Sequence, residues 1–152
     1  MSTSVQAKII STRDFVHNAS IANEFEIESS QLALEKSQNN DVKDFAQRMV
    51  DDHTDTGDRM KEALSSSGSK AKPTDMLDNK HQRLMNKLES ASDDNFDRQY
   101  ISIQTDAHKE AVNLFSNYAK NGKDASLKNF ASETLPTLKE HLQHVRQLNE
   151  NQ

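Results

Sequence analysis

Apolar side chains recur at helical spacing from the first residues that carry a clear pattern. Advancing about 100° per residue places four apolar side chains close to one line: Phe15, Ala19, Ala22 and Ala33. Ser11-Thr-Arg-Asp14 precedes them and resembles a capping box with Asp in its last place. The polar pair Asn39-Asn40 is typical of a turn. The pattern predicts a long helix from about residue 12 to this pair.

A second amphipathic segment follows directly. Asn40 or Asp41 is expected to cap it, and its apolar stripe consists of Val42, Ala46, Met49, Met60 and Leu64. The next segment, SSSGSKAKP (65–73), is the one flexible, low-complexity stretch of the chain. It predicts a crossover loop rather than a tight turn.

The second half of the chain predicts one short helix and two long ones. Thr74 is expected to cap the short helix, whose inner side carries Leu77, His81, Leu84, Met85 and Leu88. Residues 92–95 end it and cap a long helix that runs from Phe96 to Tyr118. Asn121-Gly122 is a stop signal and Asp124 caps the last helix. Pro136 lies inside that helix and is expected to kink it.

These elements form two tight helical hairpins joined by one longer crossover. Short loops make antiparallel neighbours, so the sequence predicts an all-α fold: a ferritin-like four-helix bundle with a short extra helix in the central crossover. Residues 1–11 are expected to be a flexible N-terminal segment, and residues 12–150 a single helical-bundle domain. With three glycines, two prolines and few β-branched or aromatic residues, the composition also favours helices.

Composition and charge exclude several classes of function. The net charge is −5 and the chain has no basic block, so nucleic acid is not expected as a partner. Without cysteine there is no disulfide, thiolate metal site or catalytic thiol. No apolar run reaches the roughly 18 residues of a spanning helix, and no export signal is visible. The sequence as given predicts a cytoplasmic protein, or a periplasmic or envelope protein if a leader has been removed.

Each long helix carries one metal-competent side chain on or beside its apolar stripe: Glu26, His53, His108 and His141. Counted from the turns, Glu26 and His53 lie at nearly the same height, whereas His108 and His141 differ by five residues, or roughly 7 Å. Imidazole and carboxylate groups from separate helices are typical ligands for Zn, Fe, Mn or Cu in a bundle core. Glu28 and Asp52 are alternates, or partners that orient a ligand ring.

Other interpretations of the histidines remain open. His53 is equally consistent with a core histidine hydrogen-bonded to Glu26, or with a cation paired with Glu26 or Asp52. His81 is expected to serve packing or capping, and His144 to lie on the surface. No Glu in the chain is followed three residues later by His, so the usual di-iron pattern of ferritin-like oxidases is absent.

Four stretches carry a resemblance to a known family: DFVHNASIANEFEIESSQLAL (14–34), VKDFAQRMVDDHT (42–54), FDRQYISIQTDAHKEAVNLF (96–115) and LPTLKEHL (135–142). They resemble the bacterial ferritin-like family called domain of unknown function 4142, whose members are often labelled as outer-membrane or secreted proteins. The resemblance covers about residues 12–148 and implies a ferritin-like helical bundle. It implies no particular activity.

The sequence therefore leaves three hypotheses. The first is a ferritin-like protein that binds a transition metal ion in the bundle core and acts in metal handling or stress tolerance. The second is a non-catalytic structural or interaction module with a polar core and no metal. The third, disfavoured by the missing di-iron pattern, is a metal-dependent redox enzyme. A homo-oligomer is compatible with all three.

Overall fold

The computed structural model describes residues 9–152, and within them the fold is all-α, as predicted. Residues 1–8, which make up most of the predicted N-terminal segment, lie outside the described residues. The helices are α1 (Thr12–Lys36), α2 (Asn40–Ser65), α3 (Asn79–Ser90), α4 (Asp93–Asn121) and α5 (Ala125–Glu150). None of them is long and apolar enough to cross a membrane.

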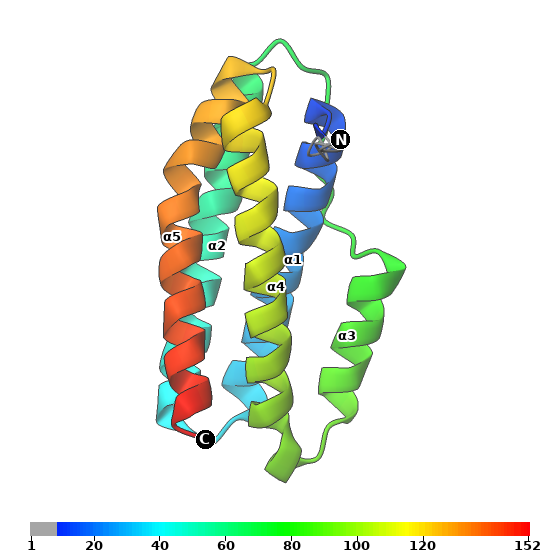
Figure 1. The fold of residues 1–152 in the computed structure, drawn as a ribbon. Coiled ribbons are helices and arrows are strands. Elements are labelled where there is room, and N and C mark those ends of the chain that lie inside the picture. Colours follow the sequence, from blue (N-terminus) through cyan, green and yellow to red (C-terminus); the bar gives the residue numbers. More distant parts are fainter. Residues whose placement is uncertain (1–8) are drawn as a thin grey trace, which may run out of the picture.

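The four long helices form a bundle, and α3 lies outside it (Figure 1). Helix α1 packs beside α2 and α4, and α5 packs beside the same two helices, so each long helix has two antiparallel neighbours. Because α2 ends at the opposite end of the bundle from the start of α4, the crossover must return along the bundle's whole length. Helix α3 lies on this return path, against α1 and α4.

Three of the predicted helix caps are confirmed, including Ser92 at the start of α4, and two are displaced. Ser11 Oγ accepts from the Asp14 backbone N–H at 3.1 Å, and Asp124 Oδ1 accepts from Leu127 at 3.0 Å. The cap of α2 is Asn39 rather than Asn40 or Asp41, because the Asn39 side chain accepts from the next two free N–H groups.

The prediction that Thr74 caps the short helix was wrong. The cap is Asp78, whose Oδ1 accepts from the His81 backbone N–H at 2.9 Å. Thr74 instead lies in the crossover loop, where its N–H donates to Ser20 Oγ of α1 at 3.0 Å. This bond ties the loop to the bundle, and α3 begins five residues further on, at Asn79.

Pro136 does not interrupt α5, which is continuous from Ala125 to Glu150. Proline removes the bond to the carbonyl four residues earlier, here that of Ser132. Both residues are exposed, so water can replace the missing donor.

The buried apolar residues form two clusters at opposite ends of the bundle. The lower cluster, near the α1–α2 turn in Figure 1, contains Phe45, Phe96, Tyr100, Val145 and Leu148 among others. The upper cluster, near the α4–α5 turn, is centred on Phe15, Met60, Phe115, Tyr118 and Leu127. The two clusters share no buried residue. Between them lies a layer of buried polar side chains that includes Glu26 and three histidines.

Helix α3 is held to the bundle at its C-terminal end. Lys36 Nζ donates to the carbonyls of Leu88, Glu89 and Ala91 at 2.9–3.3 Å, which places a positive charge at the negative end of the α3 dipole. Leu88 itself is fully buried in the lower cluster.

We expect Leu88→Ala to destabilise the protein by about 3 kcal/mol, because it removes buried methyl groups and leaves a cavity. Leu84→Ala, one turn earlier on the same helix and only half-buried, is the matched control and should cost clearly less. Urea unfolding measures both. Equal losses would contradict the anchoring role of Leu88.

Candidate metal centre

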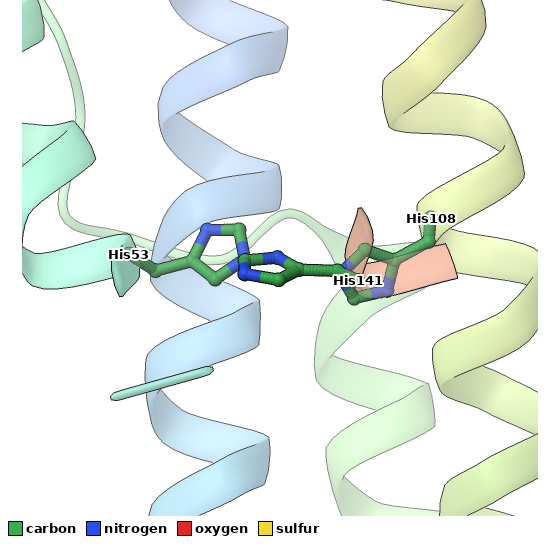
Figure 2. A group of neighbouring side chains, drawn as sticks. All are labelled: His53, His108 and His141. Atoms are coloured by element: carbon green, nitrogen blue, oxygen red, sulfur yellow. The ribbon is translucent and has the colours of Figure 1, made fainter. Parts of the chain in front are cut away.

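Three histidines from three helices meet in the polar layer. His53 of α2, His108 of α4 and His141 of α5 point toward one another (Figure 2). One ring nitrogen of each lies within 4.8 Å of the other two, and the residues are only 1–3% exposed. Nitrogens that share an ion at about 2.1 Å lie at most about 4.2 Å apart. A small movement of the rings would therefore close them around one ion.

The sequence predicted that His108 and His141 differ in height by five residues along the bundle axis. The ring centroids are only 5.4 Å apart, so the predicted offset does not hold for the rings. His108 lies 13 residues before the end of α4 at Asn121, and His141 lies 16 residues after Ala125. Helical side chains tilt toward the N-terminus of their own helix. In this hairpin the tilt moves the His108 ring away from the turn and the His141 ring toward it, which closes the remaining difference.

The His53 ring is held by Asn23 of α1. Its Nδ1–H donates to Asn23 Oδ1 at 2.9 Å, and Asn23 Nδ2 donates to the His53 carbonyl at 2.8 Å. This arrangement excludes the predicted alternative in which Glu26 is the partner of His53. Gly57, inside α2, leaves room for the Asn23 side chain, because a Cβ at residue 57 would come within 3.1 Å of Asn23 Nδ2.

The His108 ring is held by its own helix. Its Nδ1–H donates to the carbonyl of Gln104, one turn earlier, at 2.8 Å. The Gln104 side chain is also buried, and its Nε2 donates to Ser29 Oγ of α1 at 2.9 Å. His108 is thus fixed to α4, and α4 is fixed to α1 at the same level.

The His141 ring is held by Asp52, one of the two residues that the sequence suggested as partners able to orient a ligand ring. Its Nε2–H donates to Asp52 Oδ2 at 2.7 Å. Arg48 donates to the same carboxylate oxygen at 3.4 Å and to Glu140 at 2.9 Å. The guanidinium therefore offsets the negative charge that would otherwise favour a protonated His141.

These three bonds fix the tautomer of each ring. The nitrogens left without a hydrogen are His53 Nε2, His108 Nε2 and His141 Nδ1, and none of the three has a hydrogen-bond partner among the described residues. Buried acceptors without a donor are rare in proteins. Three of them facing one point have the chemistry of a metal site in which every ligand ring is oriented from behind.

Burial keeps all three imidazoles neutral. It lowers the pKa of His108 to about 4 and that of His141 to about 3, and in His141 the charges of His108, Arg48 and His144 add to the effect. The pKa of His53 is lowered well below its ordinary value by burial and by the other two histidines. Because the ring is bonded to the Asn23 amide and no carboxylate pairs with it among the described residues, the alternative in which His53 is a cation in a salt bridge is wrong.

Glu26 is buried beside this centre but does not belong to it. Its carboxylate is not among the ligand atoms that lie within 4.8 Å of one another. Burial raises the pKa of Glu26 to about 8, although a hydrogen bond with the Gln104 side chain opposes the shift. Glu26, His53 and His108 line one cavity of about 20 Å³, which is room for a single water molecule.

The remaining candidates lie elsewhere. Glu28 is half-buried, and its charged neighbour is Glu89 of α3. His81 is bonded to the cap residue Asp78 at 2.6 Å and packs edge-on against Phe25, which confirms a capping and packing role. His144 was expected on the surface, but it is half-buried with its ring against Phe45.

Sequence reasoning missed Asn23, Gln104 and Gly57. Asn23 and Gln104 are amides on inner helical faces, and only the tertiary contacts show that they act on His53 and His108. Gly57 carried a signal, because glycine inside a helix costs roughly 1 kcal/mol relative to alanine and so calls for a reason. That reason is the space taken by Asn23.

The fold and the site together define a helical bundle with a buried three-histidine centre. The family described as domain of unknown function (DUF4142) matches residues 1–148, so the chain belongs to this family. No curated protein matches the chain.

Two solved structures are similar in fold. CopM in its Cu(II)-bound form has a TM-score of 0.79 and 19% identity, and the match covers 95% of this chain and 99% of CopM. A DUF305 fragment from Deinococcus radiodurans has a TM-score of 0.76 and 15% identity, with 91% and 95% covered. At these identities the likeness shows the fold alone.

The metal-free protein should be most stable near pH 6.5. Between about pH 4.5 and 6.5 the unfolded chain binds three protons at these histidines that the folded chain does not bind, and the lowered pKa of His144 adds to this in the same direction. The folded chain binds one at Glu26 that the unfolded chain has lost. The unfolded state then binds two more protons, so stability rises with pH, by up to about 1.4 kcal/mol per pH unit for each proton. Between pH 6.5 and 8 only Glu26 contributes, and stability falls.

Urea unfolding from pH 5 to 9 in the presence of a chelator measures this profile. In Glu26→Gln the rise below pH 6.5 should persist and the fall above it should disappear. A parent profile that keeps rising from pH 6.5 to 8 would contradict the raised pKa of Glu26. A profile flat below pH 6.5 would contradict the neutral histidines.

Proposed function

We propose that this protein binds one transition metal ion through His53 Nε2, His108 Nε2 and His141 Nδ1, and that it serves in metal handling. The observation that carries the proposal is the convergence of three buried, unprotonated nitrogens whose rings are each held by a hydrogen bond from behind. Without an ion these nitrogens face one another with no donor.

The donor set supports copper or zinc as the ion. Three imidazoles suit Cu(II) and Zn(II), whereas Mn prefers oxygen ligands and di-iron sites need several carboxylates. CopM, which shares the fold, was solved in a Cu(II)-bound form. Three histidines leave one coordination position open. The cavity of about 20 Å³ beside His53 and His108 can hold the water that would occupy it.

The size of that cavity supports binding rather than turnover. It holds one water-sized molecule, and no organic substrate fits there. We therefore favour a protein that holds or transfers an ion over a metal-dependent redox enzyme. The competing function, a structural module with a polar core, predicts a melting temperature that is indifferent to metals and chelators.

Purified, untagged protein should bind one equivalent of Cu(II) or Zn(II), and the bound ion should raise the melting temperature by several degrees, because an ion that binds only the folded state stabilises it. His108→Ala should lose this shift. His17→Ala, which removes an exposed histidine of α1, is the control and should keep it. Calorimetric titration with each metal and thermal melts measure both. A parent protein that binds neither ion would refute the proposal.

Removing the group behind a ligand ring should weaken binding without removing a ligand. We expect Asp52→Ala to lower metal affinity by about 10–100-fold, because His141 then loses the bond that fixes its tautomer and orientation. Asp51→Ala, an exposed neighbour bonded to Gln47, should leave affinity unchanged. Competition titration against a chromophoric chelator gives the two dissociation constants. Equal effects would mean that charge alone, and not orientation, matters.

A further inference from the structure

A surface pocket lies next to the buried centre. It has a volume of about 290 Å³ and is lined by residues of α1 and α4 and of the N-terminal end of α3, including Phe25, Asp78, His81, Glu110 and Leu114. The pocket therefore lies where α3 packs against α1 and α4 (Figure 1). The Lys80–Glu110 ion pair, at 3.0 Å and more than half exposed, joins α3 to α4 at this pocket.

The wall between this pocket and the inner cavity is thin. Ala22 and Glu26 of α1, with Ala107 and Ala111 of α4, line both the surface pocket and the cavity of about 20 Å³ that reaches His53 and His108. The three alanines are only half-buried. Because alanine side chains are small, a slight separation of α1 and α4 at this level would be enough to connect the surface pocket with the inner cavity.

Glu26 is the polar member of that wall. It is 4% exposed, and its Oε2 has no hydrogen-bond partner among the described residues. A carboxylate oxygen is a ligand for both Zn(II) and Cu(II), yet this one stands apart from the three ligand nitrogens. Because it lies between the surface pocket and the histidines, Glu26 is placed to contact an ion transiently on its way to them.

The other approaches to the histidines are obstructed by bonds, by charge or by packing. Between α1 and α2 another surface pocket reaches His53, but Asn23, which lines that pocket, makes two hydrogen bonds to His53 there. Between α2 and α5, Asp52 covers His141, and the Arg48 guanidinium behind it would repel a cation. Along the bundle axis, the lower and upper apolar clusters lie on either side.

We propose that metal ions reach and leave the three-histidine centre through the pocket between α1, α3 and α4, with Glu26 as the last side chain they contact before His53 and His108. This proposal rests on the proposed function, because it concerns the route to that site. A residue on the route, unlike a ligand, changes the rates of uptake and release by the same factor and leaves the affinity unchanged.

The test is stopped-flow uptake of Cu(II) from its glycine complex, together with release to excess chelator. Ala111→Leu places extra carbon atoms in the wall and narrows the route, so it should slow both steps by about tenfold or more. Glu26→Gln keeps the shape and replaces the ionisable carboxyl group with an amide, so it should also slow both steps. Both variants should load to the same stoichiometry and affinity as the parent protein.

Thr54→Leu is the matched control. Thr54 is exposed and lines the separate pocket between α1 and α2 that also reaches His53, so its rates should equal those of the parent. Slowing by Thr54→Leu alone would place the route there and overturn the proposal, as would unchanged rates in Glu26→Gln and Ala111→Leu. A loss of affinity in Glu26→Gln would make Glu26 a ligand instead.

If Ala111→Leu fails to fold, as its circular dichroism would show, Glu26→Gln decides alone, because an amide in place of a neutral carboxyl preserves the packing. A parent protein that binds neither Cu(II) nor Zn(II) would refute the proposed function itself. That outcome is distinct from unchanged rates in variants that load fully.

Discussion

The structure depends on burying three imidazole rings while each directs a nitrogen without a hydrogen toward the other two. A buried acceptor without a donor costs about 1–3 kcal/mol, so three of them consume a large part of the 5–15 kcal/mol that stabilises a typical domain. The lower and upper apolar clusters must offset this cost, because the polar layer between them buries no comparable apolar surface. An ion that accepts all three lone pairs would turn this local penalty into a stabilising interaction.

Each ring is oriented by a different part of the fold, and this gives the centre its rigidity. His53 depends on a neighbouring helix through Asn23, His108 on its own helix through Gln104, and His141 on Asp52 of α2. Helix α1 supplies no ring to the centre, but it supplies Asn23 and the cavity wall at Glu26. Helix α1 therefore contributes by orienting one ring and by lining the cavity beside it.

The similar structures and the site contribute different parts of the conclusion. CopM and the DUF305 fragment establish that this chain has a shared helical-bundle fold, and family membership covers nearly its whole length. At 15–19% identity neither carries a site over to this chain. The case for metal binding rests on His53, His108 and His141 themselves, on their tautomers and on their burial.

Local signals in the sequence determined the helices and the set of side chains that face the core. Capping residues such as Ser11 and Asp124 act within one helical turn. The apolar stripe is a property of one helix, so the placement of His53 on it could be predicted. The prediction that Thr74 caps the short helix failed because Thr74 lies in the crossover loop, bonded to Ser20 of a distant helix, and Asp78 caps α3 instead.

Only the tertiary structure decided which of the four candidates meet. Periodicity places a side chain on a face, but the distance between two faces depends on how one hairpin stands against the other and on the tilt of each side chain. Those factors bring His108 and His141 together despite their predicted offset, and they leave Glu26 in the wall of the cavity. The tautomers were likewise beyond the sequence, because each depends on a hydrogen bond that forms only once the rings are packed.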